Sequence, residues 1–334
     1  MNATRVVHVA EVSEVSAARR VAQQCAEATG LGEQLAARAA LVTTELGTNL
    51  IKHGGGGSIL FGSDESRDKT LTIIAIDKGR GISNVAAASR DGYSTAGSPG
   101  NGLGAIARST SEFDIYTLAD KGTAILCRVG SPANGYEARP PRMVVGGICV
   151  PKRGEEENGD GWTAIVGAEV VTIAVADGLG HGPSAALAST GVLRVIRERD
   201  QLPLTELMEE AHGATRATRG SAVGIVRILP ASGRLDFVGV GNIAGTITNE
   251  EGHRKTVSLP GIVGHDMRRV QLFSYPWTAA SILVMHSDGI STSWNLNAYP
   301  GLSDRDPMLI AAVLFRDYCR GTDDATVVVA KATQ

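Results

Sequence analysis

Aspartates recur beside strand-sized apolar runs in the second half of this 334-residue chain. Most of them stand next to a glycine, as in the stretch Asp177-Gly178-Leu179-Gly180-His181-Gly182, which follows the apolar run Val170–Ala176. The positions that share this pattern are Asp160, Asp177, Asp288 and the pair Asp323-Asp324. One Asp-Gly pair alone usually marks a turn. Several, spread over one domain at the ends of strands, favour a common site.

Carboxylates at the ends of neighbouring strands converge, and several together in a partly buried place require cations. The region offers oxygen ligands, with little histidine and no paired cysteines. Hard oxygen ligands favour Mg²⁺ or Mn²⁺ over Zn²⁺. The second half therefore predicts a divalent-metal site built from aspartates.

Three patterns in the first half suit a nucleotide. Glu45 and Asn49 are four residues apart on a predicted helix, so they project from one face. Asp77 ends an apolar strand, and Gly79 and Gly81 follow it, so a carboxylate could accept a hydrogen bond from a base amino group. A glycine-rich stretch, residues 100–104, leads into a helix whose backbone amides suit phosphate oxygens. It is neither a Walker loop nor a Rossmann fingerprint. Each pattern alone is weak evidence, but the three together, in this order and spacing, strongly indicate a nucleotide site.

The elements that must position these residues form two α+β domains. Three prolines in the stretch 131–142 predict a linker, which divides the chain into domains 1–130 and 143–334. The first mixes helices and antiparallel strands in one sheet, and the second is strand-rich with helices outside its sheets. Expected helices lie near 15–28, 33–53, 102–111, 184–199, 204–219 and 307–318. Expected strands lie near 58–62, 70–77, 113–118, 123–129, 143–150, 162–167, 170–176, 222–228, 234–240, 244–248, 282–285 and 325–330.

Composition excludes several classes of protein. The chain has 32 Lys and Arg against 35 Asp and Glu, so it lacks the basic patch of a nucleic-acid or membrane-surface binder. No apolar run is long enough to cross a bilayer, and no signal peptide is visible. The four cysteines form no Cys-x-x-Cys motif. We expect a reduced, cytoplasmic protein.

The first domain resembles the GHKL (Bergerat-fold) ATPases, and among them the serine kinases of the RsbT/RsbW type. The resemblance lies in the segments Glu45–Asn49, Asp77–Gly81, Gly100–Gly104 and Lys121–Thr123. It implies an α/β sandwich that binds ATP, with Mg²⁺ on Asn49, the adenine amino group on Asp77 and Glu45 as catalytic residue on the attacking hydroxyl. The remaining nucleotide contacts it implies are Gly79, Gly81, Gly100, Gly102, Leu103, Gly104 and Thr123.

The second domain resembles the metal-dependent PPM serine/threonine phosphatases, in the bacterial branch with the sporulation and RsbX enzymes. The stretch Asp177–Gly182 is the most specific part. The resemblance implies an αββα sandwich with two Mn²⁺ or Mg²⁺ ions and an activated water that attacks phosphorus. It implies that Asp177 bridges the metals. The further ligands it implies are the Gly178 carbonyl, Asp160, Asp288 and Asp323, with Asp324 as the alternative to Asp323.

Several roles stay open at this point. Arg142 and Arg153 are candidates for the phosphate contact by position only. His181 could act as an acid, but we expect it to shape the loop after Asp177. Glu155–Glu157 could hold a third metal, although a solvated acidic loop is the simpler interpretation.

Together the two domains suggest a bifunctional enzyme of partner switching. The resemblance implies that it dephosphorylates, and with ATP phosphorylates, a serine or threonine on a STAS-domain antagonist or stressosome-type protein, with a sigma-factor regulator as a further partner. One alternative is a phosphatase whose first domain only senses ATP and binds the partner. Another is a non-enzymatic anti-sigma-like adaptor. The intact acidic residues argue against the adaptor.

Overall fold

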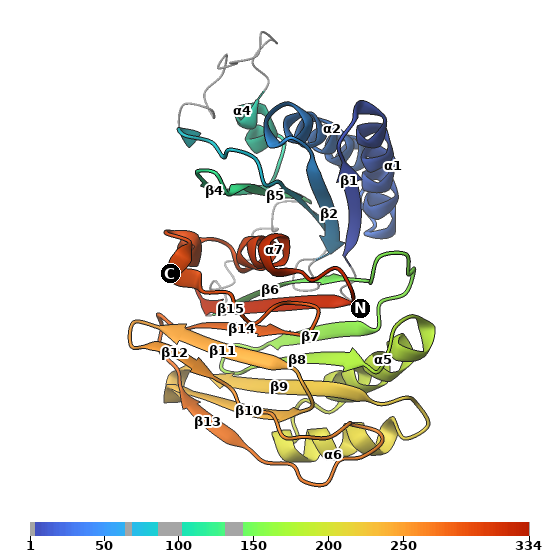
Figure 1. Cartoon of the computed structure of the whole chain (residues 1–334), viewed down its shortest axis with the longest axis vertical. Coiled ribbons are helices and arrows are strands. Elements are labelled where there is room, and N and C mark those ends of the chain that lie inside the picture. Colours follow the sequence, from blue (N-terminus) through green and yellow to red (C-terminus); the bar gives the residue numbers. More distant parts are fainter. Residues whose placement is uncertain (1–3, 64–68, 86–101, 131–142, 334) are drawn as a thin grey trace. The chain divides into compact units, whose positions relative to one another are not determined.

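The computed structural model describes residues 4–63, 69–85, 102–130 and 143–333, drawn in colour in Figure 1. Within these residues the chain divides into two compact units. The first combines residues 4–130 with the segment Asn295–Arg316, and the second combines residues 143–294 with 317–333.

The first unit is built on one antiparallel sheet with the strand order β1-β2-β3-β5-β4. Helices α1 (Val12–Ala28), α2 (Glu33–Asn49) and α4 (Leu103–Arg108) pack on one face of it. The strands are β1 (Arg5–Val9), β2 (Gly57–Ser63), β3 (Thr70–Ile76), β4 (Glu112–Leu118) and β5 (Gly122–Gly130).

Alternation along the strands explains which residues reach the helices. Ile73, Ile115 and Ile125 point into the core shared with α1 and α2, together with Leu46 of α2. Strands β3 and β5 are nevertheless buried at every position, so their other face is covered as well. Apolar runs without alternation are typical of strands buried on both faces.

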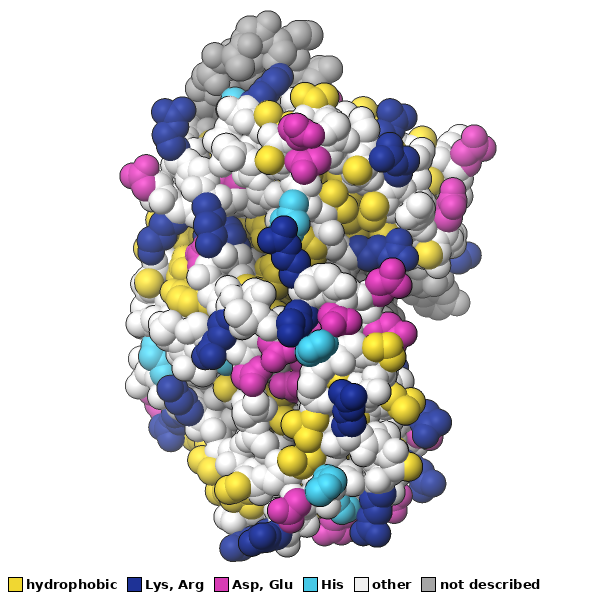
Figure 2. All heavy atoms as spheres, turned by 45° about the vertical axis from the view of Figure 1, so that its right-hand side comes forward, with side chains coloured by type: hydrophobic (Ala, Val, Ile, Leu, Met, Phe, Trp, Pro, Cys, Tyr) yellow, Lys and Arg dark blue, Asp and Glu magenta, His cyan; other side chains and the backbone are white. Residues whose placement is uncertain are grey.

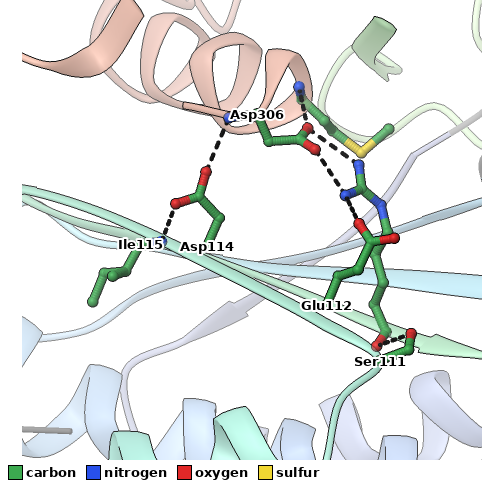
Figure 3. Close-up of polar contacts among 7 residues, drawn as sticks. Ser111, Glu112, Asp114, Ile115 and Asp306 are labelled. Carbon is green, nitrogen blue, oxygen red and sulfur yellow. Dashed lines mark hydrogen bonds and ion pairs between the residues drawn. The ribbon is translucent and has the colours of Figure 1, made fainter. Parts of the chain in front are cut away.

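That second face receives a segment from the far end of the sequence. Asn295–Arg316 belongs to the first unit by its contacts, and it holds most of helix α7 (Pro307–Tyr318). Just before α7, Asp306 donates its amide to Asp114 of β4 (Figure 3), and Arg305 donates to the same carboxylate. The ring of Tyr299 contacts that of Tyr116 of the same strand in a tilted arrangement, with the ring centroids 6.5 Å apart. Residues 307–314 of α7 are all buried, as expected for a helix that is apolar all round.

The second unit contains two five-stranded antiparallel sheets packed face to face. Their orders are β13-β10-β9-β8-β7 and β12-β11-β14-β15-β6. The first sheet uses β7 (Asp160–Val166), β8 (Val171–Gly178), β9 (Ser221–Leu229), β10 (Arg234–Val240) and β13 (Phe273–Pro276). The second uses β6 (Met143–Val150), β11 (Ala244–Asn249), β12 (Gly252–Lys255), β14 (Ile282–His286) and β15 (Ala325–Ala332).

Each face of the first of these sheets has its own core. Ile173, Val226 and Phe237 meet Leu283 and Val328 of the other sheet between the two layers. The alternate residues of β8, β9 and β10 face outward and pack under helices α5 (Pro183–Glu198) and α6 (Leu204–Ala214), as Figure 1 shows. The helices thereby fix the ends of β8 and β9, where the aspartate motif lies.

The expected α+β class is confirmed, and most expected elements form within a residue or two of their predicted bounds. The strands β1, β12 and β13 were not predicted. All three are short edge strands with half-exposed residues, and their weak apolar pattern hides them in the sequence. None of the described helices combines the length and the apolar character needed to span a lipid bilayer.

The close approach at Gly122 gives a stability prediction. Gly122 has a φ of +92°, and a Cβ there would lie 2.0 Å from the Asp77 carbonyl oxygen. Gly55 has a φ of +69° with open space around it. We expect Gly55→Ala to cost about 1 kcal/mol from the left-handed backbone alone. Gly122→Ala should cost clearly more, because backbone atoms must also move. Chemical denaturation of both variants measures this, and equal losses would contradict the packing described.

Candidate metal centre and nucleotide site

Strand pairing brings two of the predicted aspartates face to face. In the β7–β8 ladder Asp160 stands opposite Asp177, and Asp177 pairs on its other side with Ala222 of β9. Directly opposed like charges destabilise a sheet unless something compensates them. The pair therefore marks the end of the sandwich as a place where positive charge is needed.

Asp160 is the most deeply buried member of the group, with 1% of its surface exposed. Its Oδ2 accepts a 2.6 Å hydrogen bond from Ser287 Oγ, whereas Oδ1 is buried with no partner among the described residues. The pKa of Asp160 is raised to about 7, mainly by burial; the charges of Asp324 and Asp288 also raise it, while Ser287 and Thr326 lower it. A buried carboxylate oxygen without a partner calls for an explanation, and its chemistry fits a ligand of a divalent cation.

Among these aspartates, Asp177 has the most strongly raised pKa. Its pKa is raised to about 9, mainly by burial and then by the charges of Asp160, Asp288, Asp323 and Asp324 in that order. The other four carboxylates therefore lie close enough to Asp177 for their charges to disfavour its ionised form. Figure 2 shows acidic side chains gathered together on one face of the molecule.

Asp288, Asp323 and Asp324 differ in how many hydrogen bonds their carboxylates accept from the protein. Asp288 is exposed, and its Oδ2 accepts a 2.8 Å bond from Asn242 Nδ2. Asp324 is 3% exposed, and its two oxygens accept the backbone amides of Lys152 at 2.8 Å and Gly159 at 3.0 Å. Asp323 Oδ1 accepts only the amide of its neighbour Asp324, at 3.0 Å. Asp324 thus holds the loop before β7, while Asp323 is half-exposed.

The carboxylates are gathered but not closed into a cage. In the described part of the chain, no three His, Cys, Asp or Glu side chains are arranged to hold one ion. Mg²⁺ keeps several of its waters and is commonly held by one or two carboxylates. The residues present fit such a water-rich centre, because Asp160 Oδ1 lacks a partner and Asp177 is surrounded by like charge.

Glycines allow the backbone to close around the aspartates. A Cβ on Gly178 would lie 2.1 Å from the Ala185 carbonyl oxygen at the start of α5, and one on Gly159 would lie 2.6 Å from Asp324 Oδ2. The Gly178 amide donates to the Gly159 carbonyl at 3.0 Å. Asp324, Gly159 and Gly178 are therefore linked in a chain of contacts that orients the Asp177 loop.

Three neighbours of this group were not predicted from the sequence. Ser287 and Asn242 hydrogen-bond Asp160 and Asp288. Arg219 is exposed and precedes β9, and its Nη1 lies 3.1 Å from the point that a Cβ on Gly180 would occupy. The Ser287-Asp288 adjacency was visible in the sequence, but the approach of Arg219 depends on the β8–β9 pairing.

The structure describes most of the residues whose roles the sequence left undecided. His181 Nδ1 pairs with Glu155 Oε1 at 2.7 Å, an arrangement that ties the Asp177 loop to the loop before β7. This agrees with a loop-shaping part for His181 and engages Glu155. Arg153 is exposed, and Arg142 lies outside the described residues.

In the first unit Asp77 is fixed from several directions. Its Oδ1 accepts the amides of Gly79 at 2.8 Å and Thr123 at 3.2 Å, and its own amide donates to the Thr123 carbonyl at 3.0 Å. Burial raises the pKa of Asp77, and these amides partly oppose the shift. No described residue donates to Oδ2. A rigid carboxylate with one engaged oxygen can offer the other to a base amino group.

Helix α2 leads towards this carboxylate through an unusual turn. Glu45 and Asn49 are half-buried, and Asn49 is the last residue of α2. A π-helical turn, Leu50–Gly54, follows it, and a Cβ on Gly54 would lie 2.8 Å from Asp77 Cβ. Single π turns are frequent at functional sites. The structure thus connects the Glu45/Asn49 helix to Asp77 through Gly54.

The remaining predicted nucleotide contacts are placed in part. Gly81 has a φ of +74° and packs on the Leu118 carbonyl, and a Cβ on Gly79 would lie 2.8 Å from the His53 carbonyl oxygen. Gly102 caps the six-residue helix α4, which begins with Leu103 and Gly104. Gly100 lies outside the described residues.

The raised aspartate pKa values predict a pH dependence. An unfolded aspartate has a pKa near 4, so between about pH 5 and pH 8 the metal-free native state binds more protons than the unfolded state. Metal-free stability should therefore fall as the pH rises through this range. Mn²⁺ must displace these protons, so its Kd should drop at least about tenfold from about pH 6 to about pH 8.

Thermal unfolding without metal and calorimetric Mn²⁺ titration check this prediction. Asp177→Asn should flatten both profiles. A Kd for Mn²⁺ that does not change with pH would show that the aspartates do not bind the ion.

Comparison with known families identifies both halves of the chain. Residues 9–129 match the family described as Histidine kinase-like ATPase domain (HATPase_c_2). Residues 167–333 match Stage II sporulation protein E (SpoIIE). The serine/threonine-protein kinase RsbT of Bacillus subtilis (strain 168) is 34% identical over 126 residues, which make up 37% of this chain and 95% of RsbT.

Two solved structures agree with these matches. A chain from "The bacterial stressosome: a modular system that has been adapted to control secondary messenger signaling" is 26% identical with a TM-score of 0.54, over 57% of this chain and 99% of that one. RsbX in complex with magnesium has a TM-score of 0.50 at 17% identity, over 57% and 96% of the two chains, which shows the fold alone.

The two matches support the expected enzyme classes. The SpoIIE match supports a metal-dependent protein serine/threonine phosphatase, and the RsbT match supports an ATP-dependent serine/threonine kinase. The chain therefore belongs to the stage II sporulation protein E family of PPM phosphatases, and its first half belongs with RsbT to the histidine kinase-like ATPases.

Proposed function

We propose that this protein is a bifunctional partner-switching regulator. Its second unit removes phosphate from serine or threonine of a STAS-type regulatory protein, and its first unit adds phosphate from ATP. The observation that carries the proposal is the cross-strand pair Asp160–Asp177, surrounded by the charges of Asp288 and Asp323, on the same chain as the fixed carboxylate of Asp77.

In the phosphatase half, Asp177 and the Gly178 carbonyl would hold Mn²⁺ or Mg²⁺. Asp288 and Asp323 would be further ligands, because backbone amides already engage both oxygens of Asp324. Asp160 would contribute its unpartnered Oδ1 directly or through water. When bound, the ions supply charge neutralisation and an activated water nucleophile. Ser287 and Asn242 orient Asp160 and Asp288 by the hydrogen bonds described.

In the kinase half, Asp77 accepts the adenine amino group and thereby sets the position of the nucleotide. Asn49 provides an amide oxygen for Mg²⁺, and Glu45, one helical turn earlier, faces the attacking hydroxyl. Gly102 and Gly104 offer backbone amides to the phosphates. Phosphoryl transfer requires mainly positioning and charge stabilisation, which these groups supply.

The relatives suggest the partner. RsbT is a serine/threonine-protein kinase and one structural relative belongs to the bacterial stressosome, so we propose a STAS-domain antagonist or stressosome-type protein as substrate, in control of a sigma factor. The four cysteines are all free thiols, which fits a reducing, cytoplasmic setting.

A second candidate is a phosphatase whose first unit senses ATP without transferring phosphate. One contact favours it. Arg316, which comes from the second half of the sequence, donates a 3.2 Å hydrogen bond to the Asp77 carbonyl oxygen. A nucleotide bound at Asp77 would therefore act on Arg316, which belongs to a distant part of the sequence.

The two functions are separated by following the mass of a STAS-domain partner. Asp177→Asn should lower Mn²⁺-dependent phosphate loss at least about a hundredfold, and Glu45→Gln should abolish phosphate gain from Mg²⁺-ATP while leaving phosphate loss intact. Asp304→Asn and Glu27→Gln are matched controls on exposed residues. Phosphate gain that persists in Glu45→Gln rejects the assigned role of Glu45, and no gain in the unmodified protein favours the ATP sensor.

We also propose Arg219 as the phosphate contact, because its guanidinium lies beside Gly180 in the loop after Asp177. Arg219→Ala should raise KM for a phosphoserine peptide about tenfold or more with a smaller effect on kcat, since a charge-assisted hydrogen bond to the substrate is lost. Arg216→Ala, an exposed neighbour, is the control. Steady-state kinetics in Mn²⁺ measure it, and an unchanged KM in Arg219→Ala removes the assignment.

A further inference from the structure

The segment Asn295–Arg316 leaves the second unit and returns to it at one point, beside the candidate metal ligands. Ile290 and Cys319 form an isolated antiparallel bridge, and the Arg320 amide donates to the Gly289 carbonyl at 2.9 Å. Gly289 directly follows Asp288, and a Cβ there would lie 1.9 Å from the Asp324 carbonyl oxygen. The chain before the excursion and the chain after it are therefore joined next to Asp288, where Gly289 also lies against the Asp324 backbone.

Within the first unit, the body of the segment is anchored by a buried ion pair. Arg128 of β5 is 2% exposed, and it reaches Asp306 with two hydrogen bonds of 2.8 and 3.1 Å and Glu112 with one of 2.8 Å. Figure 3 shows Asp306 above β4, with its amide on Asp114 and its carboxylate towards the bonded guanidinium. Breaking a buried pair leaves an uncompensated charge, so this anchor is strong.

The last residue of the segment reaches the nucleotide site. Arg316 is 8% exposed, its Nη1 donates to the Asp77 carbonyl oxygen, and its charge acts on the Asp77 carboxylate. Seven residues after Arg316 comes Asp323. One short stretch of chain thus contacts the proposed adenine-binding residue at one end and carries a proposed metal ligand at the other.

We propose that Asn295–Arg316 couples nucleotide binding at Asp77 to metal binding at Asp177, Asp288 and Asp323. The inference rests on the proposed function, since it requires both ligands to bind. A base held by Asp77 orders the backbone that Arg316 contacts, and this ordering extends through the continuous chain to Asp323. The second ligand then binds to a chain that is already ordered, so each ligand tightens the other by the same factor.

The test titrates the full chain with Mn²⁺ alone and with Mn²⁺ in saturating adenosine, a probe without phosphates that could chelate the metal. We expect the Kd for Mn²⁺ to fall at least about fivefold in adenosine, and the Kd for adenosine to fall equally in Mn²⁺. Asp177→Asn should remove the effect of Mn²⁺ on adenosine binding, which shows that the metal acts from the proposed centre.

Asp306→Asn weakens the anchor without removing the side chain, and Asp304→Asn makes the same change of charge at an exposed position of the segment. The coupling factor should drop to below about twofold in Asp306→Asn, with each ligand alone binding as before, and stay unchanged in Asp304→Asn. Independent binding of the two ligands in the unmodified protein, mutual weakening, or full coupling in Asp306→Asn overturns the inference while both sites stand. Failure of adenosine to bind rejects the proposed nucleotide site, and the inference with it.

Discussion

Mutual repulsion among five carboxylates is the constraint on which the second unit depends. Asp160 and Asp177 are placed opposite each other by the β7–β8 ladder, and burial and neighbouring charge raise the pKa of both. The apolar core between the sheets fixes these strands, so the aspartates cannot separate to relieve the repulsion. Only protons or cations can compensate such a group, and in the proposed function divalent cations would do so at neutral pH and supply the chemistry of a phosphatase.

The surrounding polar groups divide into those that build the end of the sandwich and those that can serve a ligand. Asp324 belongs to the first kind, because both of its oxygens hold backbone amides. Asp160 belongs to both, since Ser287 holds one oxygen and the other has no partner in the described chain. In the first unit Asp77 repeats this division, with Oδ1 engaged by amides and no described donor on Oδ2. Each site thus contains a carboxylate with one oxygen hydrogen-bonded by the protein and the other left for a ligand.

Much of this organisation can be predicted from residue pattern. Aspartates beside apolar runs predict a common site, and the β7–β8 ladder does place Asp160 opposite Asp177. The Glu45/Asn49 spacing, Asp77 and the following glycines predict the nucleotide site that we propose. What the sequence does not show depends on tertiary contacts. The apolar run 307–318 predicts helix α7 at its true bounds, but nothing local indicates that it covers the first unit's sheet. Likewise, Asp306 and Arg128 are 178 residues apart, and their pairing has no sequence signature.

The central claim is that these distant aspartates hold divalent ions at one end of the sandwich. Anomalous diffraction from a crystal grown with Mn²⁺ tests it most directly. We expect two manganese peaks a few ångströms apart, both within ligand or single-water distance of Asp177, with Asp288 and Asp323 around one of them. Manganese bound elsewhere, or this end of the sandwich empty at saturating Mn²⁺, would contradict the account.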